Sequence, residues 1–398
     1  MSILQQLKDD TKWQSFLNKK LESHLPNTIL EQYKTFINNK QYQPLVDKII
    51  NGSYTFSTPR KIQIGKMGKT KKRTVYLFQH DENYILKMLT YLLYEYDHLF
   101  SPNLFSFRQN SGVKNAIHYI THHKIDTMYG YKVDIQNYFN SIDIQLLLPQ
   151  LQKDLQDEPL YQLFHQILTK QQTLYHDEII NEQTGAMAGV PLSTFLANYY
   201  LKDLDAYFHQ QGIIYARYAD DILFFANTLE QLLEYKQYLV QYLKEKHLTI
   251  NTEKEYIYQP KDKIEFLGFS YENGTIDLSN NTIKKMKGKI RRTARGLRRW
   301  KLKKQASNEI TLKAMNRKFN KKFYGKETTD LSWQYWFFPT INTTKSLKII
   351  DAYMQQWQRY IITGKHNKTN YKKVPYSFLK KCNYIPLVHA YYTYKEEK

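Results

Sequence analysis

The sequence predicts an α+β protein in which an antiparallel sheet carries clustered acidic residues and a basic helical region follows. The segment RYADDILFF, residues 217–225, is flanked by apolar, β-favouring residues, which predicts a β-hairpin with Asp220 and Asp221 at its tip. Apolar residues recur at helical spacing over residues 1–60, 81–100 and 229–247. Residues 278–308 contain no acid, and their apolar residues also suit one face of a helix.

The adjacent carboxylates of Asp220 and Asp221 are a candidate metal site. Two ionised carboxylates repel each other, so folding tolerates them best with a divalent cation between them, and oxygen-only ligands favour Mg²⁺ or Mn²⁺. A site for two ions needs a ligand from a second segment, and Asp134, after the strand-like residues 130–133, supplies one. Taken alone, the hairpin could equally be a solvated acidic turn and Asp134 a helix N-cap.

From about Lys66 to Phe269 the chain resembles the bacterial, non-retroviral reverse transcriptases. In that family, one Asp and a later Tyr-x-Asp-Asp pair hold two catalytic metal ions. The resemblance therefore implies two Mg²⁺ ions, with Mn²⁺ as the substitute, at Asp134, Ile135, Asp220 and Asp221. It also implies the right-hand polymerase fold: fingers, a palm with an antiparallel sheet, and a helical thumb and C-terminal region.

Three further motifs follow in the order of the family. GAMAGVPLSTFLANYYL, residues 185–201, resembles its glycine turn and helix, where Gly189 would face nucleic acid. Glycine at both 185 and 189 suits a backbone that lies under a base pair, where a bulky side chain would not fit. The family usually has Gln where this chain has Ala188, so we expect altered nucleotide discrimination and template grip. LTINTEK, residues 248–254, resembles the family's segment whose Lys lies near the triphosphate, so Lys254 is the candidate for that role. EFLGFSY, residues 265–271, resembles the primer-grip hairpin, with Leu267 and Gly268 in it.

The fingers have two expected contacts. Residues 66–73 form a basic turn, and the resemblance assigns Lys72 or Arg73 to the incoming triphosphate. The alternative is a solvated lysine-rich turn. The segment 101–117 resembles a fingers element that contacts the template through Phe107 and Arg108, although a Phe there is also compatible with a core position.

Phe139 is the residue expected to select deoxyribonucleotides. In the family, a bulky aromatic residue five positions after the first Asp blocks the ribose 2′-hydroxyl, and Phe139 occupies that position. Polymerases that make RNA instead need room and polar partners for this hydroxyl. The alternative is that Tyr138 points inward and Phe139 packs beneath the palm.

The segments divide into four predicted domains: a helical N-terminal extension (1–60), fingers (61–130), a palm with interleaved fingers elements (131–277), and a basic thumb with an aromatic-rich C-terminal region (278–398). Between Lys284 and Lys304 there are twelve Lys or Arg, and the family's thumb tracks the duplex backbone here. A solvated basic face is the alternative. The expected phosphate contacts are Arg291, Arg292, Arg295, Arg298 and Arg299.

Composition agrees with a polyanionic partner. Lys and Arg number 58 against 37 Asp and Glu, a formal net charge of +21. Cys382 is the only cysteine, which excludes intrachain disulfides and cysteine-rich zinc fingers. No run approaches the length of a membrane span and no leader opens the chain, so we expect a cytoplasmic protein without membrane association.

The C-terminal pattern, with WFFP at 336–339 and a tyrosine-rich tail, is similar to that of defence-associated, antiphage reverse transcriptases. The acids after the palm are too few for a ribonuclease H site. The leading hypothesis is therefore a reverse transcriptase that copies a dedicated noncoding RNA into cDNA from dNTPs. An untemplated or protein-primed DNA polymerase of abortive-infection type and a noncatalytic RNA-binding scaffold are the alternatives; primer, trigger and oligomeric state cannot be read from the sequence.

Overall fold

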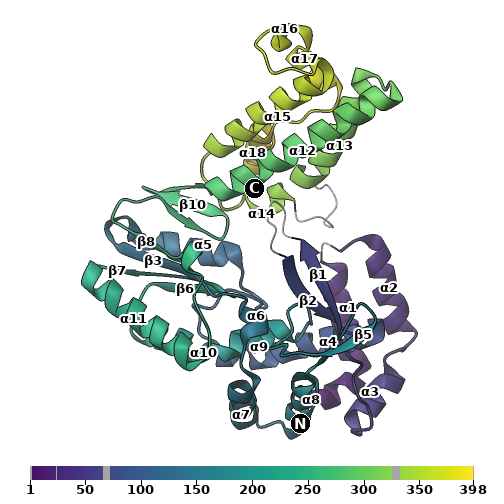
Figure 1. The fold of residues 1–398 in the computed structure, drawn as a ribbon, viewed down its shortest axis with the longest axis vertical. Helices are drawn as coiled ribbons and strands as arrows, with labels where there is room; N and C mark the ends of the chain where they lie inside the picture. The colour runs from purple at the N-terminus through teal and green to yellow at the C-terminus, as the bar shows by residue number, and fades with distance from the viewer. Residues whose placement is uncertain (1, 24, 66–71, 325–331, 398) are drawn as a thin grey trace. The chain divides into compact units, whose positions relative to one another are not determined.

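The computed structural model describes residues 2–23, 25–65, 72–324 and 332–397. The chain forms two compact units (Figure 1). Unit 1 comprises Met1–Leu21 and Thr28–Pro260, and unit 2 comprises Glu22–Asn27 and Lys261–Lys398. The expected α+β class is confirmed, because both units combine helices with antiparallel strand pairs. Within the described ranges, no helix has the length and apolar character needed to cross a membrane.

The helices predicted for residues 1–60 are present. Trp13 anchors them: its ring is fully buried, stacks on Tyr42 with centroids 4.1 Å apart, and its indole N–H donates to the Leu7 carbonyl at 2.8 Å. Burial of large aromatic rings is what stabilises such short helices, since isolated helices of this length are marginal in water. The segments are η1 (Ile3–Lys8), α1 (Asp10–Leu21), α2 (Asn27–Asn38) and α3 (Gln43–Ile50).

A four-stranded sheet, which we call the fingers sheet, follows in unit 1 with strand order β2-β1-β4-β5. β1 (Arg60–Gly65) pairs antiparallel with β2 (Lys72–Leu77) and parallel with β4 (Gln172–Tyr175). β5 (Glu178–Asn181) completes a hairpin with β4 that was not predicted from the sequence. This hairpin comes from a segment far along the chain, so the fingers sheet depends on tertiary pairing.

The second sheet, which we call the palm sheet, has strand order β6-β7-β3-β8 and is antiparallel throughout. It confirms the predicted acidic hairpin. Its central strands are apolar and buried on both faces, and Phe208 stacks on Tyr215 with ring centroids 4.6 Å apart. α10 and α11 cover one face (Figure 1). The strands are β3 (Tyr129–Asp134), β6 (Tyr215–Tyr218), β7 (Asp221–Ala226) and β8 (Tyr256–Tyr258).

The remaining helices of unit 1 connect and cover these sheets. The stretch 81–100, predicted as one helix, is α4 (His80–Leu92) followed by the 3₁₀ segment η2 (Leu93–Leu99). The predicted palm helix at 229–247 is α11 (Leu229–Glu245). The others are α5 (Val113–His122), η3 (Ile125–Thr127), α6 (Tyr138–Ser141), α7 (Ile144–Leu155), α8 (Glu158–Thr169), α9 (Ser193–Tyr200), α10 (Lys202–Gln210) and η4 (Thr252–Lys254).

Unit 2 begins with a three-stranded sheet of order β11-β10-β9, formed by β9 (Ile264–Phe266), β10 (Phe269–Glu272) and β11 (Thr275–Leu278). The sequence pattern assigns these strands to the palm, whereas their contacts group them with the helices that follow. α12 (Asn280–Lys304) is the predicted basic helix, capped by the Ser279 hydroxyl. Its buried side is Met286, Ile290 and Ala294, while Trp300, expected on that side, is 41% exposed.

α12 packs most extensively on α15 (Lys345–Thr363) and also on α13 (Asn308–Tyr324). Asp351 of α15 accepts backbone N–H bonds from Leu387 at 2.8 Å and Val388 at 3.0 Å, which caps the last helix. Figure 1 shows α16 and α17 at one end of this helical group. The short helices are α14 (Trp333–Trp336), α16 (Asn370–Lys373), α17 (Tyr376–Lys381) and α18 (Leu387–Glu396).

Candidate active site

Strand pairing in the palm sheet brings the three predicted acids together. Asp134 is the last residue of β3 and lies opposite Asp221, the first residue of β7. Asp220 occupies the turn between β6 and β7, and its carbonyl accepts the Ile135 N–H at 2.9 Å. Carboxylate oxygens of the three residues lie within 4.8 Å of one another. This donor set, all oxygen and drawn from two segments, fits hard divalent cations such as Mg²⁺.

The acids repel one another in a poorly solvated site. Burial, then the charges of Asp220 and Asp134, raises the pKa of Asp221 to about 6. Burial, then the charge of Asp134, raises the pKa of Asp220 above its usual value. Protein cations offset this repulsion only in part, which leaves negative potential for a metal ion to neutralise.

Lys254 lies directly beside the clustered acids. Its ammonium group forms an ion pair with the Asp134 carboxylate, and its side chain is 48% exposed. Asn251, three residues earlier, holds the same acid: its backbone N–H donates to the Asp134 carbonyl at 2.7 Å and its amide to the carboxylate at 3.3 Å. Ile135 has a fully buried side chain, so only its main chain can serve a metal ion.

A cavity of about 440 Å³ in unit 1 contains several of the residues expected to bind dNTPs. Phe139, Ala188 and Gly189 line it together with Arg73, which is also close enough to lower the pKa of Asp220. None of the described residues that line it is acidic. The other described lining residues are Lys20, Lys87, Thr90, Phe107, Val190, Pro191, Ser193 and Thr194.

The turn after β3 separates the roles of Tyr138 and Phe139. Tyr138 is 2% exposed, and its hydroxyl donates to the Ala197 carbonyl. Phe139 lines the cavity, where its ring lies 6.1 Å from that of Phe107 in an edge-on arrangement. Of the two registers compatible with the sequence, the structure has the one with Phe139 toward the cavity.

The glycine turn is held by backbone contacts on both sides. Asn140 accepts the Ala188 N–H at 2.8 Å, and the Ala188 carbonyl accepts the Tyr76 N–H of β2 at 2.8 Å. Gly185 has φ +54°, and a Cβ there would lie 2.7 Å from the Phe139 carbonyl oxygen. Gly185 is therefore required by the packing of the chain itself, a reason different from the base-pair contact inferred from the sequence.

The residues expected to act in the fingers differ from one another in their surroundings. Lys72 and Arg73 begin β2 with exposed side chains, and the preceding part of the basic turn, residues 66–71, lies outside the described residues. Phe107 has φ +54° and is 39% exposed. Arg108, expected on the template, forms a two-bond ion pair with Asp97, both bonds at 2.8 Å, and also donates to the Ser101 carbonyl at 2.6 Å. In this structure the Arg108 side chain therefore anchors its own segment.

Leu267 and Gly268 form the turn between β9 and β10 in unit 2. Both have positive φ, +49° and +91°. The Gly268 carbonyl accepts the Ser279 N–H and the Thr282 hydroxyl, each at 2.9 Å, so the start of α12 fixes this turn. The predicted hairpin is present, and its tip is rigidly tied to the basic helix.

The arginines predicted to contact phosphates are not equivalent. Arg291, Arg292, Arg295 and Arg299 are exposed along α12. Arg298 is partly buried and donates to the carbonyls of Ile361 at 2.9 Å and Ile362 at 3.1 Å, near the end of α15. Such carbonyls are left without helical partners at a C-terminus, so Arg298 has a structural role here.

The tyrosines of the C-terminal tail differ in how far they are buried. Tyr384 and Tyr391 are buried in the core of unit 2, whereas Tyr371 and Tyr392 are each 53% exposed. The Arg359 guanidinium lies 4.3 Å from the ring centroid of Tyr371. Of these four tyrosines, the two exposed ones are therefore the candidates for stacking on a base.

Several residues around the site were not identified from the sequence. Lys20 of α1 and Lys87 of α4 line the cavity although nothing in their local sequence distinguishes them from solvated lysines. Arg217 stands inside the RYADD motif, but its partner Asp205 is recognisable only in the folded chain, where both side chains are fully buried. A charged residue in an otherwise apolar strand was the only available signal.

Comparisons with known proteins agree with this geometry. The reverse transcriptase (RNA-dependent DNA polymerase) family matches residues 64–271. The retron Ec86 reverse transcriptase of Escherichia coli is 27% identical over 106 residues, which span 26% of this chain and 33% of that protein.

Two solved telomerase structures show weaker likeness. Apo telomerase from Candida tropicalis, truncated from its C-terminal domain, has a TM-score of 0.47 and 11% identity, covering 56% of this chain and 55% of that one. Candida albicans telomerase with a fragment of telomeric RNA has a TM-score of 0.45 and 11% identity, covering 87% and 66%. The family match alone spans more than half of the 398 residues and includes all three clustered acids, so the chain belongs to the reverse transcriptase (RNA-dependent DNA polymerase) family.

Proposed function

We propose that this protein is an RNA-directed DNA polymerase that extends a primer with dNTPs. The observation that carries the proposal is the convergence of Asp134, Asp220 and Asp221 from two segments of the palm sheet. In the proposed reaction these acids hold two Mg²⁺ ions, which would activate the attacking hydroxyl and stabilise the leaving pyrophosphate. Mn²⁺ is the expected substitute, since it accepts the same oxygen ligands.

The protein side chains would orient the reactants. In this proposal the triphosphate of the dNTP binds to Lys72, Arg73 and Lys254, whose positive charges match its negative oxygens. Arg73 borders the cavity and Lys254 contacts Asp134, which supports their placement near the reacting phosphate.

The cavity residues would select the sugar and base. In this proposal Phe139 would fill the space beside the 2′ carbon of the incoming nucleotide, so that a ribose hydroxyl would clash with its ring. Ala188 and Gly189 offer a small surface to the nascent base pair, and Phe107 continues the aromatic wall. Because Ala188 has no side-chain amide, it could not make the hydrogen bond to the nascent pair that a Gln side chain at this position could make.

Contacts to the template and primer would come from several separate elements. The exposed arginines of α12 and the turn of Leu267 and Gly268 are the proposed contacts to duplex backbone and primer. Arg108 could join the template only after breaking its ion pair with Asp97.

We further propose that the template is a dedicated noncoding RNA and that the cDNA product acts in antiphage defence. The partial match to a retron reverse transcriptase supports an RNA partner. The net charge of +21 supports a polyanionic partner in general.

The deciding experiment is sequencing of the RNA and DNA that copurify with the protein, combined with primer extension on RNA and DNA templates. One structured RNA together with complementary DNA would support the whole proposal. DNA without a complementary template would identify untemplated or protein-primed synthesis instead. Bound RNA without dNTP incorporation in Mg²⁺ or Mn²⁺ would reduce the protein to an RNA-binding scaffold.

A further inference from the structure

Ala219, immediately before the acidic pair, has a backbone conformation that side chains disfavour. Its φ is +56°, in the left-handed region, and its side chain is 5% exposed. For a residue other than glycine, this conformation persists only when the surroundings hold it. Because Ala219 directly precedes Asp220 and Asp221, its backbone conformation affects the direction in which both acids leave the turn.

Two buried side chains hold the Ala219 peptide groups. The Ser106 hydroxyl accepts the Ala219 N–H at 2.9 Å. The Arg217 guanidinium donates to the Ala219 carbonyl at 3.3 Å. Ser106 and Arg217 are both fully buried, so water does not replace either bond.

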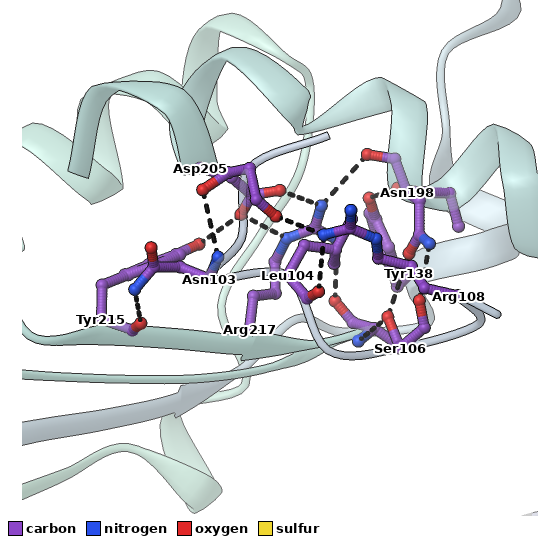
Figure 2. A network of polar contacts seen from close by, with 12 residues as sticks. Asn103, Leu104, Ser106, Arg108, Tyr138, Asn198, Asp205, Tyr215 and Arg217 are labelled. Atoms are coloured by element: carbon purple, nitrogen blue, oxygen red, sulfur yellow. Dashed lines mark hydrogen bonds and ion pairs between the residues drawn. The ribbon is translucent and has the colours of Figure 1, made fainter. Parts of the chain in front are cut away.

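These two side chains are fixed in turn by α9 and α10. The Ser106 hydroxyl donates to the Asn198 side-chain oxygen at 3.0 Å, while the Asn198 amide donates back to the Ser106 carbonyl at 2.7 Å. Arg217 donates to the Asn198 carbonyl at 3.0 Å and forms a two-bond ion pair with Asp205 (Figure 2).

The ion pair with Asp205 keeps Arg217 positively charged although its side chain is buried. Burial alone would lower the pKa of Arg217, but the charge of Asp205 and the hydrogen bonds to it raise that pKa above its usual value. Tyr215 adds a third hydrogen bond to Asp205 at 2.8 Å. The network therefore has defined donors and acceptors, and it is far more rigid than a solvent-exposed pair.

We propose that Ser106 is a positioning residue for the metal site: with Asn198 and Arg217 it locks Ala219 in the left-handed conformation and so aims Asp220 and Asp221 at the position shared with Asp134. Ser106 lies next to Phe107, so the same segment that borders the nucleotide cavity also fixes the acidic turn. This inference rests on the proposed polymerase function for its catalytic readout, but the metal-binding readout is independent of it.

The test is Ser106→Ala in the full-length protein. Without the hydroxyl, the Ala219 N–H loses its acceptor and the turn relaxes toward conformations that spread the acids. Titration of the apoprotein with Mn²⁺ should show affinity lowered roughly tenfold, the loss expected for an outer partner of a metal ligand. At saturating dNTP and metal, kcat should fall while KM for dNTP changes little.

The matched control is Ser101→Ala, a buried serine of the same segment whose hydroxyl accepts the Asn103 N–H at 3.2 Å and does not touch Ala219. The rescue is Ala219→Gly added to Ser106→Ala, because glycine adopts this φ without strain. Recovery of Mn²⁺ affinity in the double variant supports the proposal.

Three results would overturn it: unchanged Mn²⁺ affinity in Ser106→Ala, an equal loss in Ser101→Ala at the same melting temperature, or no recovery with Ala219→Gly. If Ser106→Ala does not fold, Asn198→Ala tests the same link through the residue that orients the hydroxyl. Its Mn²⁺ affinity should fall in the same direction, and an unchanged value would reject the proposal. Failure of the polymerase hypothesis would show differently, as wild-type protein that binds Mn²⁺ but does not incorporate dNTPs.

Discussion

The acids of the palm sheet in unit 1 and the arginines of α12 in unit 2 use charge in opposite ways. Asp134 is 6% exposed, and the three carboxylates converge within 4.8 Å. Four of the five arginines assigned to nucleic acid on α12 are exposed and spread along a 25-residue helix. The first arrangement concentrates charge on one point, so we expect the loss of any one acid to abolish metal binding. The second distributes it, so each member contributes a small part.

The largest effect is expected at the converging acids. Asp134→Asn or Asp220→Asn should lower dNTP incorporation at least about a thousandfold, because loss of charge at a metal ligand removes the site. Folding and RNA affinity should stay near wild type. Primer extension beside a melting curve and an RNA-binding isotherm measures all three. Near-normal polymerisation by either variant would show that the acids are not the metal ligands.

The burial of the acids, together with their mutual repulsion, leads to a prediction about pH. The folded pKa of Asp221 is raised to about 6 from 3.8, so the folded apoprotein binds this proton more tightly than the unfolded chain. Its contribution to stability therefore declines as pH rises from about 4 to about 6, and above that it is a constant penalty on the order of 3 kcal/mol.

Denaturant unfolding from pH 4.5 to 7 measures this, with Asp221→Asn as the comparison. The variant should be more stable than wild-type apoprotein at pH 7, and the difference should shrink toward pH 4.5. Mn²⁺ affinity of the wild type should rise through pH 6, since the metal needs the ionised form. A pH-independent stability difference would show that the raised pKa of Asp221 is not what separates the two proteins.

The next effect is on sugar selection. Phe139→Ala should open the space beside the 2′ carbon and raise rNTP incorporation relative to dNTP roughly 10- to 100-fold. The matched control is Tyr138→Phe, which keeps the buried ring and removes only the hydroxyl bound to the Ala197 carbonyl. Matched dNTP and rNTP pools give the ratio. A raised ratio in Tyr138→Phe, with none in Phe139→Ala, would show that Phe139 is not the gate.

The smallest effects per residue are expected on α12. Replacing Arg291, Arg292 and Arg299 by Gln should weaken binding to all duplexes and lower the slope of log affinity against log salt by about 3 units. Arg298→Gln is the matched control, because this guanidinium bonds to the end of α15. It should lower the melting temperature and leave the salt slope unchanged. Equal slopes in the triple variant and wild type would mean that α12 is only a solvated face.

Elements with strong local signals could be predicted from the amino-acid sequence. The acidic hairpin follows from the apolar, β-favouring residues on both sides of Asp220 and Asp221, and α12 follows from its apolar spacing. Asp134 could be assigned to the same site as Asp220 and Asp221 because the motifs of the family follow one another in a fixed order along the chain. The amino-acid sequence alone was therefore sufficient to predict the family and the clustering of the three acids.

Tertiary structure decided what depends on partners distant in sequence. Arg298 and Arg299 are neighbours of the same type, yet only the first meets the carbonyls of α15. β4 gives no strong strand signal; it forms a hairpin with β5 and joins the fingers sheet by pairing with β1, a strand distant in the sequence. The left-handed Ala219 persists because Ser106 and Arg217 bond to its peptide groups. Local preference is worth a fraction of a kcal/mol per residue, whereas an unmade buried hydrogen bond costs about 1–3 kcal/mol, so the distant partners prevail.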